Sequence, residues 1–379
     1  MLAIEFLDEL VFGAREAAWP LIRDDLDLSY AQIGLLIGAP NITSAFIEPA
    51  LGILGDTGWR RALIAWGGVA FAAALFAFTA APGFVVLLGA SLLLYPASGA
   101  FVSLSQVALI GADPTRAERL MARWTLAGSV GVVLGPIMLG LFVLTGAGWR
   151  GAFAFAAAIA LVLAGLSARH SGPPGAEPEK VSFREGLRGA GVAVRRATVW
   201  RWLVLLGFSD LMIDVLLGFL ALYFVDVAGS GLRTAGLAVI IWSVAGLAGD
   251  ALLVPLLERV RGLGYLRWSA RLTLLLFPAF LLVPSLGGKL GLLALIGLLN
   301  AGWYAILKAQ LYGVLPGRAG TAMAIYSASS SVTGMAPVAL GLAAQQWGLE
   351  ATMWLLLAGP VALTMGLHRA GGPQFEVAE

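Results

Sequence analysis

Twelve apolar segments, each long enough to cross a bilayer, restrict this chain to a small set of folds. A membrane-spanning helix needs about 20 apolar residues for a hydrocarbon core of about 30 Å. The segments lie approximately at residues 2–22, 30–55, 62–80, 83–110, 119–144, 151–168, 199–225, 234–257, 266–284, 290–314, 319–344 and 351–368. Because little of the 379-residue chain is left for loops, the sequence predicts an all-α membrane protein whose function resides in its helices.

The distribution of basic residues predicts the orientation of these helices. If the first segment starts in the cytoplasm, sixteen Lys and Arg residues flank the spans on that side. On the opposite side there are four, namely Arg23, Arg150, Arg233 and Lys289. This asymmetry follows the positive-inside rule and places both termini in the cytoplasm. We therefore expect a multi-pass protein of a bacterial inner (plasma) membrane, and the formal net charge of +2 reflects orientation rather than binding to nucleic acid.

An offset of 202 residues aligns the two halves of the sequence. The scarce residues that coincide in this register include the pairs Asp8 and Asp210, Glu48 and Asp250, Asp56 and Glu258, Trp66 and Trp268, Pro114 and Pro316, and Arg116 and Arg318. Such a repeat predicts two pseudo-symmetric bundles of six helices, related by an axis along the membrane normal, with the substrate path between them. The predicted parts are an N-terminal bundle (1–168), a cytoplasmic linker (169–198) and a C-terminal bundle (199–379).

The loop after the second segment resembles a signature of the major facilitator superfamily. Gly52, Asp56, Arg60 and Arg61 match its pattern of a glycine, an aspartate and paired basic residues. The resemblance covers the whole chain through the twelve spans and the repeat. It implies the twelve-helix fold of that family and transport by alternating access, with this loop bracing the cytoplasmic gate.

A second pattern resembles the drug/proton antiporter branch of the same superfamily. In the fifth segment Gly131, Gly135, Pro136 and Gly140 match the glycine and proline pattern of that branch, although tight helix packing alone would also explain them. The antiporters usually carry an arginine in the fourth span, four residues before a glycine. This chain has Tyr95 at that position, before Gly99.

Charged and aromatic residues inside the spans are the candidates for substrate binding, because ionisable groups within a membrane are costly and mark functional sites. Arg15 and Glu16 fall near mid-membrane in the first segment, and a structural ion pair is the alternative for them. In the tenth segment Asn300, Tyr304 and Lys308 recur every four positions and are expected to share one face of a helix. The full candidate set is Arg15, Glu16, Trp19, Asp214, Asn300, Trp303, Tyr304 and Lys308, with Lys308 as a counter-ion to Asp250 or Asp214 or as a site for an anionic head group.

Three carboxylates are candidates for proton coupling: Glu48, Asp250 and Asp214. A carboxylate in a low-dielectric cavity can bind a proton near neutral pH and release it when it is hydrated or paired with a cation. The alternative for Glu48 and Asp250 is that each braces the nearby cytoplasmic gate. The residues assigned to that gate are Asp8, Gly52, Asp56, Arg60, Arg61, Asp210 and Glu258.

The chain lacks the side chains that common enzyme classes require. It has two histidines, His170 and His368, no cysteine and no G-x-x-x-x-G-K-[ST] nucleotide loop. We therefore expect no enzymatic activity, no metal and no cofactor. Transport would be driven by a gradient.

These observations predict a monomeric secondary transporter. The leading hypothesis is proton-coupled efflux of a cationic or zwitterionic amphipathic small molecule, because acidic residues outnumber basic ones in the spans. The alternatives are a lipid or lysolipid flippase and an uncoupled facilitator of a small polar solute. Protons and membrane lipids are the expected partners besides the substrate.

Overall fold

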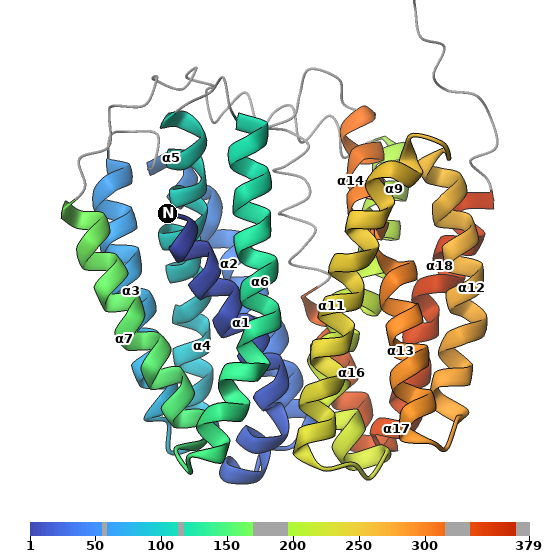
Figure 1. The fold of residues 1–379 in the computed structure, drawn as a ribbon, viewed down its shortest axis with the longest axis horizontal. Helices are drawn as coiled ribbons and strands as arrows, with labels where there is room; N and C mark the ends of the chain where they lie inside the picture. The colour runs from blue at the N-terminus through green and yellow to red at the C-terminus, as the bar shows by residue number, and fades with distance from the viewer. Residues whose placement is uncertain (55–58, 113–116, 170–195, 315–333, 369–379) are drawn as a thin grey trace, which may run out of the picture.

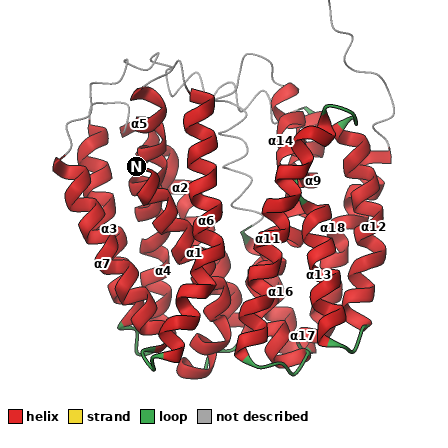
Figure 2. Ribbon diagram, in the orientation of Figure 1, coloured by secondary structure: helices red, strands yellow, loops and turns green. Residues whose placement is uncertain are grey.

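A computed structural model describes the chain except for residues 55–58, 113–116, 170–195, 315–333 and 369–379. The described chain is helical, and its helices run side by side in two sets, α1 to α7 and α9 to α18 (Figures 1 and 2). Nine of its helical stretches are long and apolar enough to cross a membrane. The helix α1 is not one of them, because charged side chains recur along it. The predicted all-α fold is confirmed.

The elements of the first six spans follow the predicted segments. They are α1 (Leu2–Leu26), α2 (Tyr30–Leu54), α3 (Arg60–Thr79), α4 (Phe84–Ser98) continued by η2 (Gly99–Ser103) and α5 (Leu104–Ala112), α6 (Ala117–Leu144) and α7 (Gly148–Arg169). The element η2 is a turn of π-helix.

The last six spans contain more interruptions. They are α9 (Ala197–Asp210) continued by η4 (Leu211–Val215), α10 (Leu216–Leu222) and η5 (Tyr223–Val227), then α11 (Leu232–Leu257), α12 (Gly262–Leu282), α13 (Leu286–Asn300) with α14 (Trp303–Gly313), α16 (Met335–Trp347), and α17 (Leu349–Met353) with η6 (Trp354–Leu357) and α18 (Ala358–His368). The predicted linker at 169–198 lies almost entirely outside the described residues.

The predicted glycine pattern of the fifth span brings α6 against α1. A Cβ atom added at Gly135 would overlap both the amide nitrogen of Ala14 and the carbonyl oxygen of Leu10. At Gly131 it would lie 2.5 Å from the carbonyl oxygen of Phe6. The two backbones are therefore in direct contact, which no larger residue at these positions permits. Gly140, by contrast, faces open space.

A second close backbone contact, between α2 and α16, joins the two sets of helices. A Cβ at Gly34 would lie 2.5 Å from the carbonyl oxygen of Pro337, and one at Gly341 would overlap the carbonyl oxygen of Tyr30. One turn further along α2, a Cβ at Gly38 would overlap the carbonyl oxygen of Gly334. This seam lies near the end of the molecule that carries the turn between α1 and α2.

An ionic contact closes the same end. Arg23, in the last turn of α1, donates a hydrogen bond of 2.7 Å through Nη2 to Oδ1 of Asp226 in η5, and Nη1 contacts the other carboxylate oxygen. Tyr30, at the start of α2, donates a 2.7 Å hydrogen bond to the same carboxylate. Asp226 of the second half is therefore held by two residues of the first half. Contacts between the halves at this end are both apolar and ionic.

The glycines of α6 allow a matched test of the packing. We expect Gly135→Ala to lower the free energy of unfolding by about 1–3 kcal/mol, because the methyl group collides with backbone atoms of α1. Gly140→Ala, where the methyl meets nothing, should be neutral or stabilising by up to about 1 kcal/mol through helix propensity. Thermal unfolding in detergent, followed by tryptophan fluorescence, measures both. Equal shifts for the two variants would contradict the packing role of Gly135.

Candidate substrate-binding site

The candidate site is built around a buried ion pair in α1. Arg15 is 5% exposed and Glu16 is 2% exposed. Nη2 and Nε of Arg15 donate hydrogen bonds of 2.7 and 3.1 Å to Oε1 of Glu16. The second carboxylate oxygen of Glu16 accepts a 3.0 Å hydrogen bond from Nε1 of Trp19. Because an isolated charge is costly in a membrane interior, each residue makes the burial of the other tolerable.

Aromatic rings surround the guanidinium group of Arg15. Its central carbon lies 5.2 Å from the ring centroids of Phe12 and Tyr95 and 6.0 Å from that of Trp19. Tyr95 comes from α4 and occupies the position where the antiporters carry an arginine. In this chain the positive charge at the centre of the first half therefore comes from α1, and α4 contributes an aromatic ring that holds it by a cation–π contact.

The second half reaches the ion pair through the interrupted seventh span. A Cβ added at Gly218 in α10 would lie 3.5 Å from Oε2 of Glu16 and 3.1 Å from Cδ1 of Ile37, so α1 and α2 both approach α10 closely. One turn earlier, the π-helical segment η4 carries Asp214. Asp214 interacts electrostatically with both Arg15 and Glu16. Single π-helical turns occur frequently at functional sites.

Acidic groups outnumber basic ones around this point. Arg15 and Glu16 neutralise each other, whereas Glu9 and Asp210 both interact electrostatically with Asp214. Three further carboxyl groups, from both halves, therefore lie within electrostatic range of one another beside a neutral pair. Such an arrangement is stabilised by a proton or by a bound cation, since like charges in a low-dielectric environment repel strongly.

A break in the tenth span separates Asn300 from Tyr304 and Lys308, with which it is predicted to share a helix face. The helix ends at Asn300 and restarts at Trp303, with Gly302 between them at φ +73°. A Cβ at Gly302 would overlap Cδ2 of Leu253, so the break requires glycine for both conformation and space. Because the spacing rule holds only along a continuous helix, it does not place Asn300 on the face that residues of α14 share.

Asn300 and Trp303 are buried within the second half. Asn300 donates a 3.1 Å hydrogen bond to the carbonyl of Met212 and accepts one of 3.3 Å from Thr273. Trp303 is fully buried, and its Nε1 donates a 2.8 Å hydrogen bond to Oγ of Ser269. Both side chains use their polar groups to hold α13 and α14 against neighbouring helices. This geometry favours a packing role for the two residues over contact with a substrate.

Lys308 and Tyr304 form a local pair on α14. Nζ of Lys308 donates a 2.7 Å hydrogen bond to the hydroxyl of Tyr304 and lies 4.8 Å from its ring centroid. The two residues therefore share a face of this helix, as their spacing predicts. A counter-ion role for Lys308 and a site for an anionic head group both stay predictions.

Asp250 caps the break in the tenth span. Its Oδ1 accepts a 3.1 Å hydrogen bond from the backbone N–H of Gly302, at a point where the helical hydrogen bonds are interrupted. On the other side of the break, the hydroxyl of Tyr265 donates to the carbonyls of Leu298 and Leu299 at 3.3 and 3.2 Å. This geometry favours the bracing alternative for Asp250, in a helix break rather than in a loop.

Glu48, the repeat partner of Asp250, lies against the equivalent point of the first half. A Cβ at Gly99 would lie 3.1 Å from Cγ of Glu48, and Gly99 opens the π-helical turn η2. Ser44 donates a 2.8 Å hydrogen bond to Glu48. In both halves a carboxylate therefore lies against the irregular point of the fourth helix in that half. Whether Glu48 carries a proton stays a prediction.

The predicted gate residues around the second and third helices lie at one end of the first half. Gly52 is in the last turn of α2, and Asp56 lies outside the described residues. Arg60 opens α3, and Arg61 donates a 2.7 Å hydrogen bond to the carbonyl of Ala168 near the end of α7. Arg61 thus ties α3 to α7 within one bundle, and the gate role of this group stays a prediction.

The other predicted gate residues are spread over both halves. Asp8 accepts a 2.9 Å hydrogen bond from Ser98 at the end of α4. Glu258 is the exposed residue that ends α11. Asp210 interacts with Asp214 within the seventh span. The structure therefore associates Asp210 with the candidate site.

Some residues that shape the site carry only weak signals in the sequence. In the sequence Tyr95 is marked only by its departure from the antiporter pattern, which has an arginine at that position. Arg23, Tyr30 and Asp226 read as ordinary span ends. Nothing in a single sequence indicates that Asp226 pairs with Arg23 across 203 positions.

Comparisons with known proteins agree with this fold. The family model described as Major Facilitator Superfamily matches residues 2–337. The structure of a bacterial homologue of the human lysosomal transporter Spinster, inward-facing and occupied, superposes with a TM-score of 0.80 at 16% identity and covers 97% of this chain and 95% of that one. The nucleoside transporter NupG, in a mutant form, gives 0.80 at 14% identity over 98% of each chain. No sequence among curated proteins matches.

The cap at the tenth-span break predicts how Asp250 responds to substitution. Asp250→Ala leaves the N–H of Gly302 without its acceptor and should lower the free energy of unfolding by about 1–3 kcal/mol. Asp250→Asn keeps a carbonyl oxygen in the same place and should remain within about 0.5 kcal/mol of the wild type, since an amide oxygen also accepts this bond. Thermal unfolding in detergent separates the two. Equal destabilisation by both variants would show that the charge, and not the acceptor, is what the break needs.

Proposed function

The chain belongs to the Major Facilitator Superfamily and is a secondary transporter that works by alternating access, and we propose that it exports a cationic or zwitterionic amphipathic molecule in exchange for protons. The observation that carries this proposal is the position of the Arg15–Glu16 pair. It is buried in the first half, and Oε2 of Glu16 would lie 3.5 Å from a Cβ added at Gly218 of the second half, one turn after Asp214. A ligand bound there contacts both halves, as alternating access requires.

The charges at this point favour a cation. Arg15 is already paired with Glu16, so each of Glu9, Asp210 and Asp214 that releases its proton adds a negative charge that no basic residue of the pair compensates. An ammonium group would be attracted by Asp214, and nearby aromatic rings would pack against its apolar part. A cation and a proton compete for the same carboxylate, so the binding of one favours the release of the other. That competition is the minimum chemistry of an exchanger.

The contacts between the halves define which end of the transporter is closed. The α2–α16 seam and the Arg23–Asp226 pair both lie at the end with the α1–α2 turn. With both termini in the cytoplasm, as the basic residues predict, this is the outer end. We infer that the structure represents a state closed to the outside, and that export requires this seam and this ion pair to separate.

A lipid or lysolipid flippase is the second candidate function. The site offers Arg15, which shares its charge with Glu16 on the first half, and the carboxyl group of Asp214 on the second, next to aromatic rings. A zwitterionic head group would match these charges while its tails remain in lipid. A flippase would act without a proton gradient, which distinguishes it from the exchanger.

Proton movement tests the leading function. In proteoliposomes containing a pH-sensitive dye, a panel of lipophilic cations should evoke a pH change that Asp214→Asn lowers by about tenfold or more, because the shared carboxylate is lost. Asp27→Asn, the same chemical change at the exposed residue after α1, is the matched control and should behave as the wild type. Lysolipid transbilayer movement without any pH change would replace the exchanger with the flippase.

The ion pair at the outer end predicts a charge-swap effect. Arg23→Asp and Asp226→Arg each place like charges together and should shift the equilibrium toward the outward-open state by roughly 5- to 150-fold. The double variant restores an opposite pair and should largely restore the wild-type distribution.

The readout is the distance between spin labels at Ala147→Cys and Arg233→Cys, one in each half at this end of the molecule. The natural chain contains no cysteine, so the spin label attaches only to the two introduced cysteines. If the double variant opened as far as either single variant, the pair would not be what keeps this end closed.

A further inference from the structure

A pocket lies at the closed end, on the seam between the halves and apart from the candidate substrate site. Its volume is about 630 Å³, within the range of about 300–1,000 Å³ typical of small-molecule sites. Tyr30 of α2 lines it from the first half. The second half contributes Asp226, Val227, the segment 347–351 and Trp354. We call this space the outer pocket.

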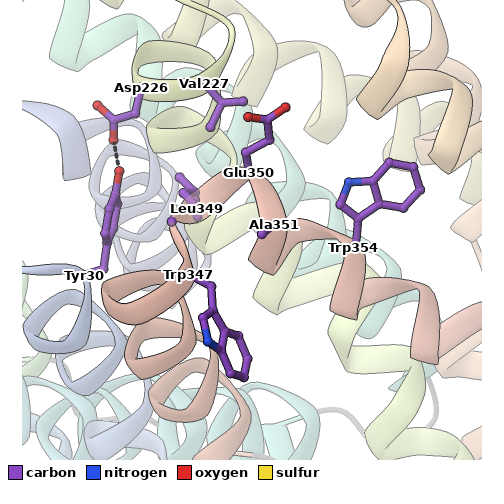
Figure 3. A pocket seen from close by; sticks show the side chains of 9 residues that line it. Tyr30, Asp226, Val227, Trp347, Leu349, Glu350, Ala351 and Trp354 are labelled. Atoms are coloured by element: carbon purple, nitrogen blue, oxygen red, sulfur yellow. Dashed lines mark hydrogen bonds between the residues drawn. The ribbon is translucent and has the colours of Figure 1, made fainter.

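The side chains of the outer pocket are arranged around one charged end. Figure 3 shows Tyr30 and Trp354 on opposite sides of the pocket, with the carboxylates of Asp226 and Glu350 at the same end. The carboxylate of Asp226 is occupied by Arg23 and by Tyr30. Its charge is therefore already compensated.

Glu350 is the available charge of the outer pocket. Its side chain is exposed, and it takes part in none of the hydrogen bonds or ion pairs between described residues. The nearby cation, Lys289, interacts with Glu350 only through longer-range electrostatics. Nζ of Lys289 donates instead to the hydroxyl of Tyr223 at 2.7 Å and to the carbonyls of Phe280 and Leu281 at 2.9 and 3.0 Å.

Aromatic side chains supply the rest of the recognition surface. Trp347 is 65% exposed and Trp354 is 36% exposed, although both line the pocket. The ring of Tyr30 already packs against Arg23, whose guanidinium carbon lies 5.4 Å from its centroid. A carboxylate with no hydrogen-bond or ion-pair partner among the described residues, combined with two indole rings, is the chemistry that binds organic ammonium groups, through ion pairing and cation–π attraction.

We propose that the outer pocket is a second binding site, distinct from the transport site, for an organic ammonium ligand. Glu350 pairs with the charge, and Trp354 and Trp347 cover the alkyl groups. The ammonium can belong to a free cation or to a lipid head group such as phosphatidylethanolamine. Both present the same chemistry to these residues.

The position of the pocket links its occupancy to the transport cycle. Tyr30 and Asp226 line it from opposite halves and also form the contact that closes this end. Separation of the halves would pull one wall from the other and destroy the site. A ligand that binds only the closed arrangement stabilises it by mass action. The ligand therefore acts as an inhibitor from the outside, an inference that rests on the alternating-access function proposed above.

Tetrabutylammonium is the probe for binding. Titrated into the purified full-length protein by calorimetry, it should bind the wild type and bind Glu350→Gln and Trp354→Leu about tenfold or more weakly, from loss of the charge or of the ring. Trp66→Leu, the same change at an exposed tryptophan on α3, should bind as the wild type. Asp214→Asn removes the carboxylate of the transport site and should leave the binding that depends on Glu350 in place. Unchanged affinity in Glu350→Gln, or loss of binding in Asp214→Asn, would overturn the assignment.

Lipid composition and distance measurements identify the source and the effect. In nanodiscs of phosphatidylglycerol alone, tetrabutylammonium should narrow the Ala147→Cys to Arg233→Cys distance distribution toward the closed state. Addition of phosphatidylethanolamine should reproduce that shift if the lipid head group is the ligand. If it does not, a free cation is the ligand. Absence of any shift with tetrabutylammonium would overturn the inhibitory role.

The two proposals fail separately. If tetrabutylammonium does not bind the outer pocket but proton exchange in proteoliposomes is observed, the outer site is rejected and the proposed function is retained. Binding at the outer pocket without any proton exchange retains the site and removes the exchanger.

Discussion

The buried ion pair between Arg15 and Glu16 makes the central position of α1 possible. Neither charge could be buried inside the helix bundle alone, because the cost of an uncompensated charge there is several kcal/mol or more. The pair is neutral overall, and the indole of Trp19 and the ring of Tyr95 complete its surroundings. As a result α1, with charged residues along its length, can occupy the contact between the halves. The glycine contacts with α6 then hold it there.

The fourth helix of each half is irregular, and in each half a carboxylate packs next to the irregular point. In each half the fourth helix is irregular, with a π-helical turn after Ser98 in one and a break after Asn300 in the other. In each half a carboxylate from the second helix, Glu48 or Asp250, lies against that point. The contacts differ, because Asp250 accepts a hydrogen bond from the backbone N–H of Gly302, whereas the side chain of Glu48 packs against Gly99. A repeated sequence therefore produces equivalent positions without equivalent roles.

Contacts across the seam are strong at one end, where backbone atoms touch and Asp226 is held by Arg23 and Tyr30. These are discrete interactions that can be made or broken, as a two-state transporter requires. They involve residues other than the central carboxylates. Closure of the end and occupancy of the centre can therefore be controlled by separate residues, with α1 connecting Arg15 to Arg23 along one helix.

The all-α membrane fold and the family follow from the amino-acid sequence alone. Lipid offers no hydrogen-bond partner for backbone groups, so a segment that crosses the membrane must be helical. The length and apolarity of a segment then decide whether it can cross, and the twelve spans are apparent without coordinates. Arg15, Glu16 and Asp214 are also identifiable in this way, because charges within such spans are rare.

Tertiary contacts settle which polar residues meet. The break at Gly302 separates Asn300 from the helix that carries Tyr304 and Lys308, and it gives Asp250 a capping role. The Arg23–Asp226 pair joins positions 203 apart. Hydrophobic periodicity describes one continuous helix, whereas these features depend on interrupted helices and on contacts between different ones. For that physical reason the sequence pattern could not show them.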